Sequence, residues 1–291
     1  MLAVDKRHAF RWCGAESENG ADVIVFGVND ESGSRATRNG SSGGPDAARA
    51  SSVKFDAVKR GKKESIMYSG LKSSRINAYD SGNIAKSKVE SFARKHAARK
   101  TVLGCIGGDH SITYEILKGI DKMVDSWGFV YIDAHPDMIS SAGKYYGSVA
   151  YDMLSLKNVE PKSCVIVGAR AIEGEEAERI QELGIKVIGM ERIIEDGIVA
   201  VSKYIKNLMP TEAYVSIDLD SVDPAFAPGV STPVPGGLEA REILYIASTI
   251  GKSVSLGFDV MELNPRYDSG GMTARLADLL MMNMAASARK R

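Results

Sequence analysis

The chain has 291 residues, in which 37 Lys and Arg are balanced by 37 Asp and Glu, so the formal net charge at pH 7 is zero. The two signs are interspersed and leave no basic stripe of the kind that binds nucleic acid, so we expect no nucleic-acid partner. This length can bury a full core in one large α/β domain. Nothing demands a second domain, and we predict a single one over residues 1–291.

The cysteines and the apolar runs indicate the cellular compartment in which the protein works. Cys13, Cys105 and Cys164 are odd in number and widely spaced, which argues against a disulfide framework and against a cysteine-based zinc site. The N-terminus has no signal-peptide core, and no stretch approaches the roughly 18 apolar residues of a membrane span. We therefore expect a cytoplasmic protein without a membrane partner.

In chain order, the first half of the sequence alternates apolar strands with helices. Residues 22–28 (DVIVFGV) form a continuous apolar run, typical of a strand covered on both faces. The segment from there to about Pro45 is too long for a simple connection, and its Arg35 and Arg38 could face a ligand or a neighbouring subunit. Further strands are predicted over residues 101–106 and 127–132, and helices over residues 46–59, 85–99 and 112–120.

The second half of the sequence continues the same alternation. In the first half, the polar stretch before residue 85 gives no clear prediction. Strands are expected over residues 164–168, 186–190, 213–219 and 254–260. Helices are expected over residues 173–183 and 192–208, between the last two strands, and from about Met272 onward. Strands that alternate with helices of this length imply βαβ units and a mostly parallel sheet.

Acids and histidines gather where the predicted strands end. In residues 130–137 (VYIDAHPD), Asp133 and His135 can point the same way, with Asp137 close behind, because residues two apart share a face of an extended chain. Earlier in the chain, two glycines let the backbone bring His110 toward a site. His8 and His96, the remaining histidines, have no comparable setting, and we interpret them as surface residues.

Three further acids lie at the ends of late strands. Asp218 and Asp220 interrupt the end of the strand predicted over residues 213–219, and Glu262 comes just after the last strand. Open α/β sheets build their sites at the carboxyl ends of their strands. We therefore expect these acids to converge with the two histidines.

The charges of this set favour bound metal. Asp133, Asp137, Asp218 and Asp220 would repel one another in a shared pocket, whereas two divalent cations would neutralise them. Because oxygen ligands predominate, Mn²⁺ is the first choice, with Zn, Co or Ni as alternatives and a single-metal site as the runner-up. Two ions about 3.5–4 Å apart would bind and acidify a bridging water. The chemistry implied is hydrolysis.

Four spaced motifs resemble, in order, the signatures of the arginase/agmatinase (ureohydrolase) family: GGDHS (107–111), DAHPD (133–137), SIDLDSVDP (216–224) with the following APGVSTPVPGG, and GFDVMELNP (257–265). The likeness runs from residues 27–28 through GPDAAR (44–49) to the terminal helix. It implies an arginase-type fold of three α/β/α layers with a mostly parallel central sheet. It also implies two Mn²⁺ ions per chain and a homotrimer or homohexamer.

The resemblance also assigns roles to residues. One metal would be held by His110, Asp133, Asp137 and Asp218, and the other by Asp133, His135, Asp218 and Asp220. Glu262 would bind the substrate guanidinium, a planar group that suits a carboxylate. The implied reaction is attack of a metal-bridging hydroxide on the guanidinium carbon, which gives urea and an amine.

One departure from the family pattern concerns proton transfer. After the DAHxD motif the family commonly carries His-Gly in a mobile loop, whereas this chain has Tyr146-Gly147. A tyrosine with its pKa near 10 is a poor proton shuttle at neutral pH. Tyr146 and Asp220 are therefore the candidate catalytic residues, with solvent as an alternative proton donor. We expect slower turnover or a different substrate.

The substrate is the most open prediction. No basic residue among residues 138–141 matches a carboxylate clamp, which favours agmatine, cleaved to putrescine and urea in polyamine biosynthesis. Arginine, formimidoylglutamate and other guanidino or amidine compounds are alternatives. Other interpretations are a single-zinc amide deacetylase and a metal-binding subunit without catalysis. A nucleotide-binding module is least supported, because neither GxGxxG nor GxxxxGK[ST] is present.

Overall fold

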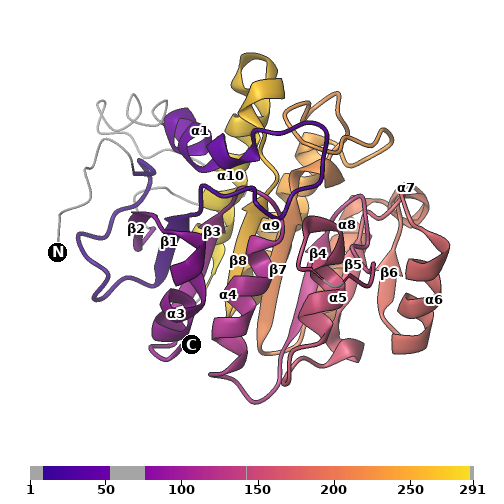
Figure 1. Cartoon of the computed structure of the whole chain (residues 1–291), viewed down its shortest axis with the longest axis horizontal. Helices are drawn as coiled ribbons and strands as arrows, with labels where there is room; N and C mark the ends of the chain where they lie inside the picture. Colours follow the sequence, from indigo (N-terminus) through magenta and orange to yellow (C-terminus); the bar gives the residue numbers. More distant parts are fainter. Residues whose placement is uncertain (1–8, 53–75, 142, 289–291) are drawn as a thin grey trace.

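In the computed structural model, which describes residues 9–52, 76–141 and 143–288, a parallel sheet lies between two layers of helices (Figure 1). The eight strands have the spatial order β2-β1-β3-β8-β7-β4-β5-β6, and every neighbouring pair is parallel. The strands are β1 Val23–Gly27, β2 Ala78–Asn83, β3 Val102–Ile106, β4 Gly128–Ile132, β5 Val165–Val167, β6 Lys186–Ile188, β7 Ala213–Asp218 and β8 Gly257–Met261. This three-layer arrangement confirms the predicted fold class.

The central strands are covered on both faces, which explains their continuous apolar sequences. In β4, Val130 and Ile132 pack into one hydrophobic core, whereas Phe129 and Tyr131 pack into a second core on the opposite face. Successive side chains of a strand point to opposite faces, so a strand between two cores needs apolar residues at consecutive positions.

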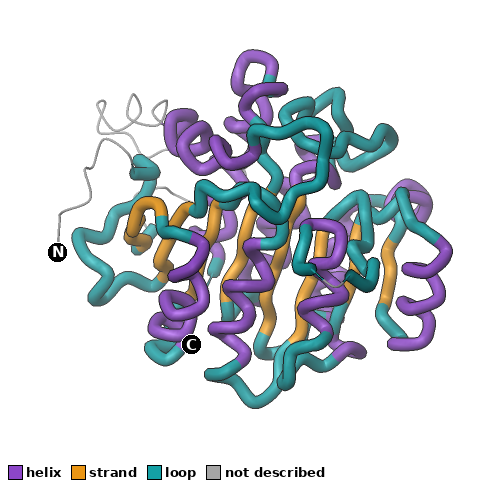
Figure 2. Tube along the Cα trace, viewed as in Figure 1, coloured by secondary structure: helices purple, strands orange, loops and turns teal. Residues whose placement is uncertain are grey.

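Two sets of helices supply the other halves of these cores. The first set is α1 Gly44–Ser51, α7 Met190–Asp196, α8 Ile198–Leu208, α9 Ala240–Ile250 and α10 Met272–Ser287. The second set is α3 Lys86–Ala97, α4 Ile112–Asp121, α5 Val149–Leu154 and α6 Gly174–Leu183. Figure 1 shows α3, α4 and α5 in front of the sheet, and Figure 2 shows loops gathered along the upper ends of the strands.

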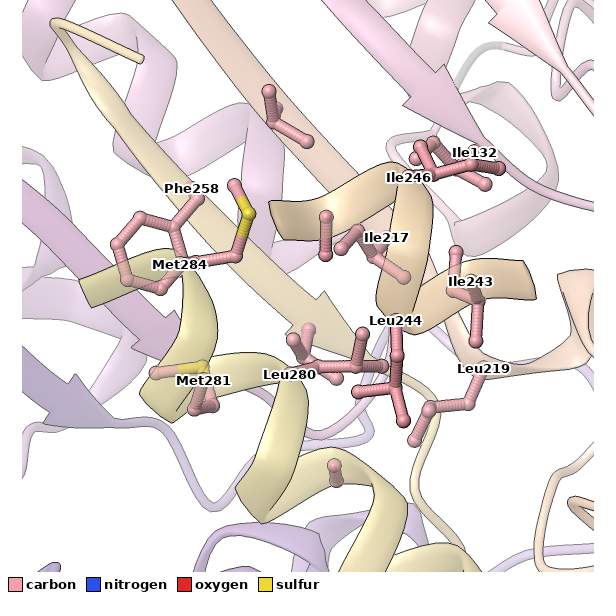
Figure 3. Close-up of a cluster of buried hydrophobic side chains, with 14 of the residues drawn as sticks. Ile132, Ile217, Leu219, Ile243, Leu244, Ile246, Phe258, Leu280, Met281 and Met284 are labelled. Carbon is pink, nitrogen blue, oxygen red and sulfur yellow. The ribbon is translucent and has the colours of Figure 1, made fainter. Parts of the chain in front are cut away.

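Figure 3 shows the part of the first core where α9 and α10 meet β7 and β8. Ile243 and Ile246 of α9 and Leu280 of α10 pack with Ile217 and Phe258 of the sheet, and all five side chains are fully buried. Burying one such side chain contributes about 1.5–3 kcal/mol. This packing holds the central strands in the register on which the site depends.

The predicted alternation of strands and helices is confirmed, and the largest difference in the described part concerns one helix. The single helix predicted over residues 192–208 is two helices, α7 and α8, separated at Gly197. This residue has φ 77° and ψ 149°, a conformation that interrupts a helix and that glycine adopts without strain. The edge strand β2 and the short helix α5 were not predicted. For the helix predicted over residues 46–59, residues 53–59 lie outside the described part.

The interpretation of His96 as a surface residue is wrong. Its side chain is 1% exposed, with its ring centre 4.4 Å from that of Phe92 and Nε2 3.7 Å from Oε2 of Glu18. The reason is its position in α3, because residue 96 continues the helical stripe that Val89 and Phe92 begin. His8 lies outside the described residues.

Two sequence expectations concern the chain as a whole. Cys13, Cys105 and Cys164 form no disulfide bond with one another, in line with the argument against a disulfide framework. Within the described ranges, no helix is long and apolar enough to cross a membrane.

Candidate metal centre

Four adjacent strands bring the site together at their carboxyl ends. The pairing of β3 with β8, β8 with β7 and β7 with β4 aligns one row of residues, which consists of Ile106, Val260, Ile217 and Ile132. Asp218 and Asp133 come directly after the last two members of this row. Their side chains therefore start from neighbouring positions at the carboxyl edge of the sheet.

A glycine pair after β3 lets the chain deliver His110 to the same edge. A Cβ on Gly107 would overlap with Sδ of Met261, and a Cβ on Gly108 would overlap with the carbonyl oxygen of Asp30. Only glycine fits such close approaches. The close approaches explain why glycines stand before His110.

His110 lies at the centre of a first group of carboxylates. Its Nδ1 is 2.9 Å from Oδ2 of Asp218, 3.3 Å from Oδ2 of Asp133 and 4.0 Å from Oδ2 of Asp137. The ring of Tyr131 stacks on the imidazole with 4.8 Å between ring centres, and the Tyr131 hydroxyl donates to Asp137. All of these side chains are buried.

His135 joins a second group that shares Asp133 with the first. His135 Nδ1 is 3.5 Å from Oδ1 of Asp133 and 3.2 Å from Oδ2 of Asp220. Thr232 donates to the same Asp220 oxygen at 2.8 Å. The backbone amide of Asp220 in turn donates to Oδ1 of Asp218 at 2.7 Å, which ties the two groups together.

Glu262 approaches the first group from the end of β8. One of its oxygens, Oε1, accepts a hydrogen bond from the backbone amide of His110 at 3.0 Å. Glu262 and Asp137 both have positive φ values, 64° and 49°, in a region that residues other than glycine rarely occupy. Such strain persists only where surrounding contacts enforce it, and it is concentrated at functional sites.

The carboxylates draw both histidines toward their charged form. Burial by itself would lower the pKa of His110, but Asp133 and Asp218 outweigh it and raise that pKa well above its usual value. Burial likewise opposes charging of His135, whose pKa is raised by Asp133 and Asp220 to about 12.

Three of the four aspartates have raised pKa values, because the aspartates together carry more negative charge than the two histidines can neutralise. Burial and the charge of Asp133 raise the pKa of Asp137. Burial and neighbouring carboxylates also raise the pKa values of Asp218 and Asp220. For Asp133, burial is outweighed by the two histidines, and its pKa is lowered. Added positive charge would stabilise such a site.

The donor set fits divalent metal ions. Two groups have ligand atoms within 4.8 Å of one another: His110 with Asp133 and Asp137, and Asp133 with His135 and Asp220. Oδ2 of Asp133 and Oε2 of Glu262 are buried and make no hydrogen bond. A buried oxygen without a partner is costly. Carboxylate and imidazole ligands are those that first-row divalent ions accept.

A cavity of about 520 Å³ opens onto the second group. Its lining residues are His135, Asp137, Ile139, Tyr145, Tyr146, Gly147, Ala171, Ile172, Glu173, Glu176 and Thr232. Glu176 at the start of α6 is 3% exposed and accepts from the backbone amide of Met138. The cavity therefore has acidic and aromatic walls next to His135 and Asp137.

The structure brings together all of the predicted site residues. Residues that sequence reasoning missed are Tyr131, Thr232, Glu173 and Glu176. Thr232 lies within a motif quoted for the family resemblance, so its place near the site could have been inferred. The sequence around Tyr131 is that of an ordinary strand, and the two glutamates have the pattern of a solvated helix start.

The two arginines of the long loop after β1 have partners. The Arg38 guanidinium lies 3.9 Å from the centre of the Tyr267 ring and donates to the carbonyl oxygen of Pro228. Arg35 is exposed and lies 4.0 Å from the centre of the Tyr145 ring, at the cavity wall.

The three-layer fold and the acidic, histidine-containing site at its carboxyl edge define the class of protein, a metal-dependent hydrolase with an α/β/α fold. The sequence model described as Arginase family matches residues 21–286. The chain belongs to the arginase family. Its members are ureohydrolases, and the chain is an enzyme that hydrolyses carbon–nitrogen bonds other than peptide bonds.

Individual relatives match over most of the chain. Proclavaminate amidinohydrolase of Streptomyces clavuligerus is 32% identical over 268 residues, which cover 89% of this chain and 85% of that protein. An agmatinase of Neisseria gonorrhoeae is 28% identical over 278 residues, which cover 92% and 87%. The crystal structure of a hypothetical agmatinase from Burkholderia thailandensis has a TM-score of 0.81 at 29% identity, covering 91% of this chain and 85% of that one.

Proposed function

We propose that the chain uses two Mn²⁺ ions to hydrolyse agmatine to putrescine and urea. The observation that carries the choice of substrate is the charge of the cavity. Asp137, Glu173 and Glu176 line it, and no lysine or arginine is among its described lining residues. Agmatine carries a positive charge at each end, which suits such walls, whereas the carboxylate of arginine would meet like charges.

The proposed ligands follow from the two groups around Asp133. One ion would be held by His110, Asp133, Asp137 and Asp218, and the other by Asp133, His135, Asp218 and Asp220. The distances from the two histidines to the carboxylates support this assignment. Bound manganese would supply Lewis acidity and lower the pKa of a water molecule.

Glu262 is the proposed guanidinium-binding residue. Its Oε1 is engaged by the backbone amide of His110, whereas its buried Oε2 makes no hydrogen bond. A guanidinium offers N–H donors in a planar fork that matches a carboxylate. Binding substrate would satisfy the oxygen that has no partner in the protein.

Asp220 and Tyr146 are the proposed catalytic residues. Asp220 lies 3.2 Å from His135, which lines the cavity, and it would pass a proton to the leaving amine. Tyr146 lines the same cavity, and burial together with the charges of Glu262 and Asp137 raises its pKa. Its phenol therefore stays protonated at neutral pH and can donate a hydrogen bond to substrate.

The same resemblance of motifs supports the proposal of a cytoplasmic homotrimer or homohexamer that acts in polyamine biosynthesis. A single domain over residues 1–291 is part of this proposal. The continuous sheet from Val23 to Met261 supports it.

The deciding experiment measures urea release by the manganese-loaded protein from agmatine, arginine and shorter guanidino acids. We expect urea from agmatine, and none from the double variant Asp133→Ala, Asp218→Ala. A matched control replaces two exposed acids of α6, Glu178 and Glu182, by alanine and keeps the activity. No urea from any compound, despite two bound Mn²⁺ per chain, would overturn the proposal.

Arginine is the second candidate substrate, favoured by one observation. Arg35 places a cation beside Tyr145 at the cavity wall, where it could pair with a substrate carboxylate. If arginine is the substrate, Arg35→Ala raises its KM at least about tenfold, the scale of one charge-assisted hydrogen bond. The same change leaves the KM for agmatine unaltered.

A further inference from the structure

A buried carboxylate behind the site has no part in the mechanism proposed above. Asp259 of β8 is 0% exposed. Its Oδ1 accepts from the Ser216 hydroxyl at 2.6 Å, and its Oδ2 accepts from the hydroxyls of Tyr214 at 2.7 Å and Thr113 at 2.8 Å. An ionised carboxylate only accepts hydrogen bonds. Three hydroxyl donors are thus directed at Asp259, as burial of such a group requires.

Ser216 connects this carboxylate to His110. The Ser216 oxygen lies 2.8 Å from Nε2 of His110. A serine hydroxyl has one hydrogen, and here that hydrogen is directed at Asp259. The same oxygen must therefore accept a hydrogen bond from His110, which requires a hydrogen on Nε2.

The hydrogen on Nε2 determines what the other ring nitrogen can do. Nδ1 directs a hydrogen at Oδ2 of Asp218, 2.9 Å away, and a metal ion bound at Nδ1 would replace this hydrogen. The imidazole would then be neutral, with its remaining hydrogen on Nε2. Nδ1 is the atom that faces Asp133 and Asp218. The Tyr131 hydroxyl lies 3.1 Å from Nδ1 but donates to Asp137, so it would not compete with a metal ion for Nδ1.

We propose that Asp259 is a positioning residue that acts through Ser216 to hold the hydrogen of His110 on Nε2, so that Nδ1 is presented to a metal ion. This inference rests on the proposed metal site. The hydrogen-bonded series Asp259–Ser216–His110 runs from β8 to β7 and then to the loop after β3. Partners of this kind orient a metal-binding histidine, and their loss typically weakens metal affinity about 10–100-fold.

The first test measures Mn²⁺ affinity of the full-length protein by competition with a chelator. Asp259→Asn and Ser216→Ala are each expected to weaken binding about 10–100-fold. The matched control is Asp278→Asn, because Asp278 is also a 0% exposed acid but its partners are Trp12 and Arg275, which are not among the proposed metal ligands. We expect the control to bind Mn²⁺ within about threefold of wild type.

The second test reads the position of the hydrogen directly. In zinc-loaded protein labelled with ¹⁵N at histidine, NMR should show the hydrogen of His110 on Nε2, with the signal assigned from its loss in His110→Asn. A hydrogen on Nδ1, or unchanged Mn²⁺ affinity in both Asp259→Asn and Ser216→Ala, would overturn the inference. Absence of Mn²⁺ binding by the wild-type protein would overturn the proposed metal site itself, and this inference with it.

Discussion

The Nδ1 atom of His110 lies 2.9 Å from Oδ2 of Asp218, although the two residues are 108 positions apart in the chain. The contact depends on β8 lying between β3 and β7 in the sheet. Each residue sits at or just past the carboxyl end of its strand, so the register of three strands sets this distance. The site is therefore a property of the assembled sheet.

Replacing Asp133 is expected to disturb both halves of the proposed metal site. Its two oxygens face different histidines, at 3.3 Å from His110 and 3.5 Å from His135. In Asp133→Ala we expect fewer than two Mn²⁺ per chain by elemental analysis, with urea release lowered at least about 100-fold. Full occupancy and normal turnover in this variant would contradict a shared ligand.

Gly108→Ala tests whether the glycine pair positions His110. The added methyl group would overlap with the carbonyl oxygen of Asp30, so the loop must shift. Overpacking of this kind costs about 1–3 kcal/mol of the free energy of unfolding, measurable by urea denaturation, and we expect weaker Mn²⁺ binding as well. Gly174→Ala is the control, because a Cβ there meets nothing within 4 Å. Equal effects of the two substitutions would count against the close-approach argument.

Because His96 is buried, we expect the free energy of unfolding to decrease in mild acid. Burial lowers the pKa of His96 to about 4, although the charge of Glu18 opposes this shift. Between about pH 4 and 6.5 the unfolded chain binds a proton at His96 that the native protein excludes. The free energy of unfolding therefore has its full value above pH 6.5 and falls as the pH drops toward 4. The decrease amounts to at most about 3 kcal/mol. Denaturation curves of His96→Gln should show a correspondingly weaker pH dependence, and an identical dependence would refute the assignment.

Tyr146→His tests the departure from the family pattern. A histidine at this position could transfer protons near neutral pH, which the phenol cannot do with its raised pKa. We expect urea release to rise about tenfold, with a new pH dependence near neutrality and unchanged Mn²⁺ affinity. Tyr145→His places the same side chain at the adjacent residue of the cavity wall and serves as the control. No change in rate or pH profile for Tyr146→His would argue against a role for this position.

Much of the fold, and the candidate residues at the carboxyl edge of the sheet, could be predicted because they depend on local sequence. A strand between two cores is apolar at successive positions, as β1 and β4 are, and a polar residue directly after it marks the carboxyl edge of the sheet. His110, Asp133, Asp218 and Glu262 all lie at or after the ends of such strands. The number and charge of these side chains are sufficient, from the sequence alone, to indicate metal-assisted hydrolysis.

Other features were decided only by tertiary structure. His96 has the composition signal of a surface residue, yet α3 presents it to Phe92 and Glu18. Ser216 and Asp259 lie inside two of the quoted motifs, but only the pairing of β7 with β8 places them side by side, with Ser216 against His110. Sequence periodicity tells which face of an element a residue occupies. What that face meets depends on strand order and on contacts between residues far apart in the chain, and these arise only when the layers pack.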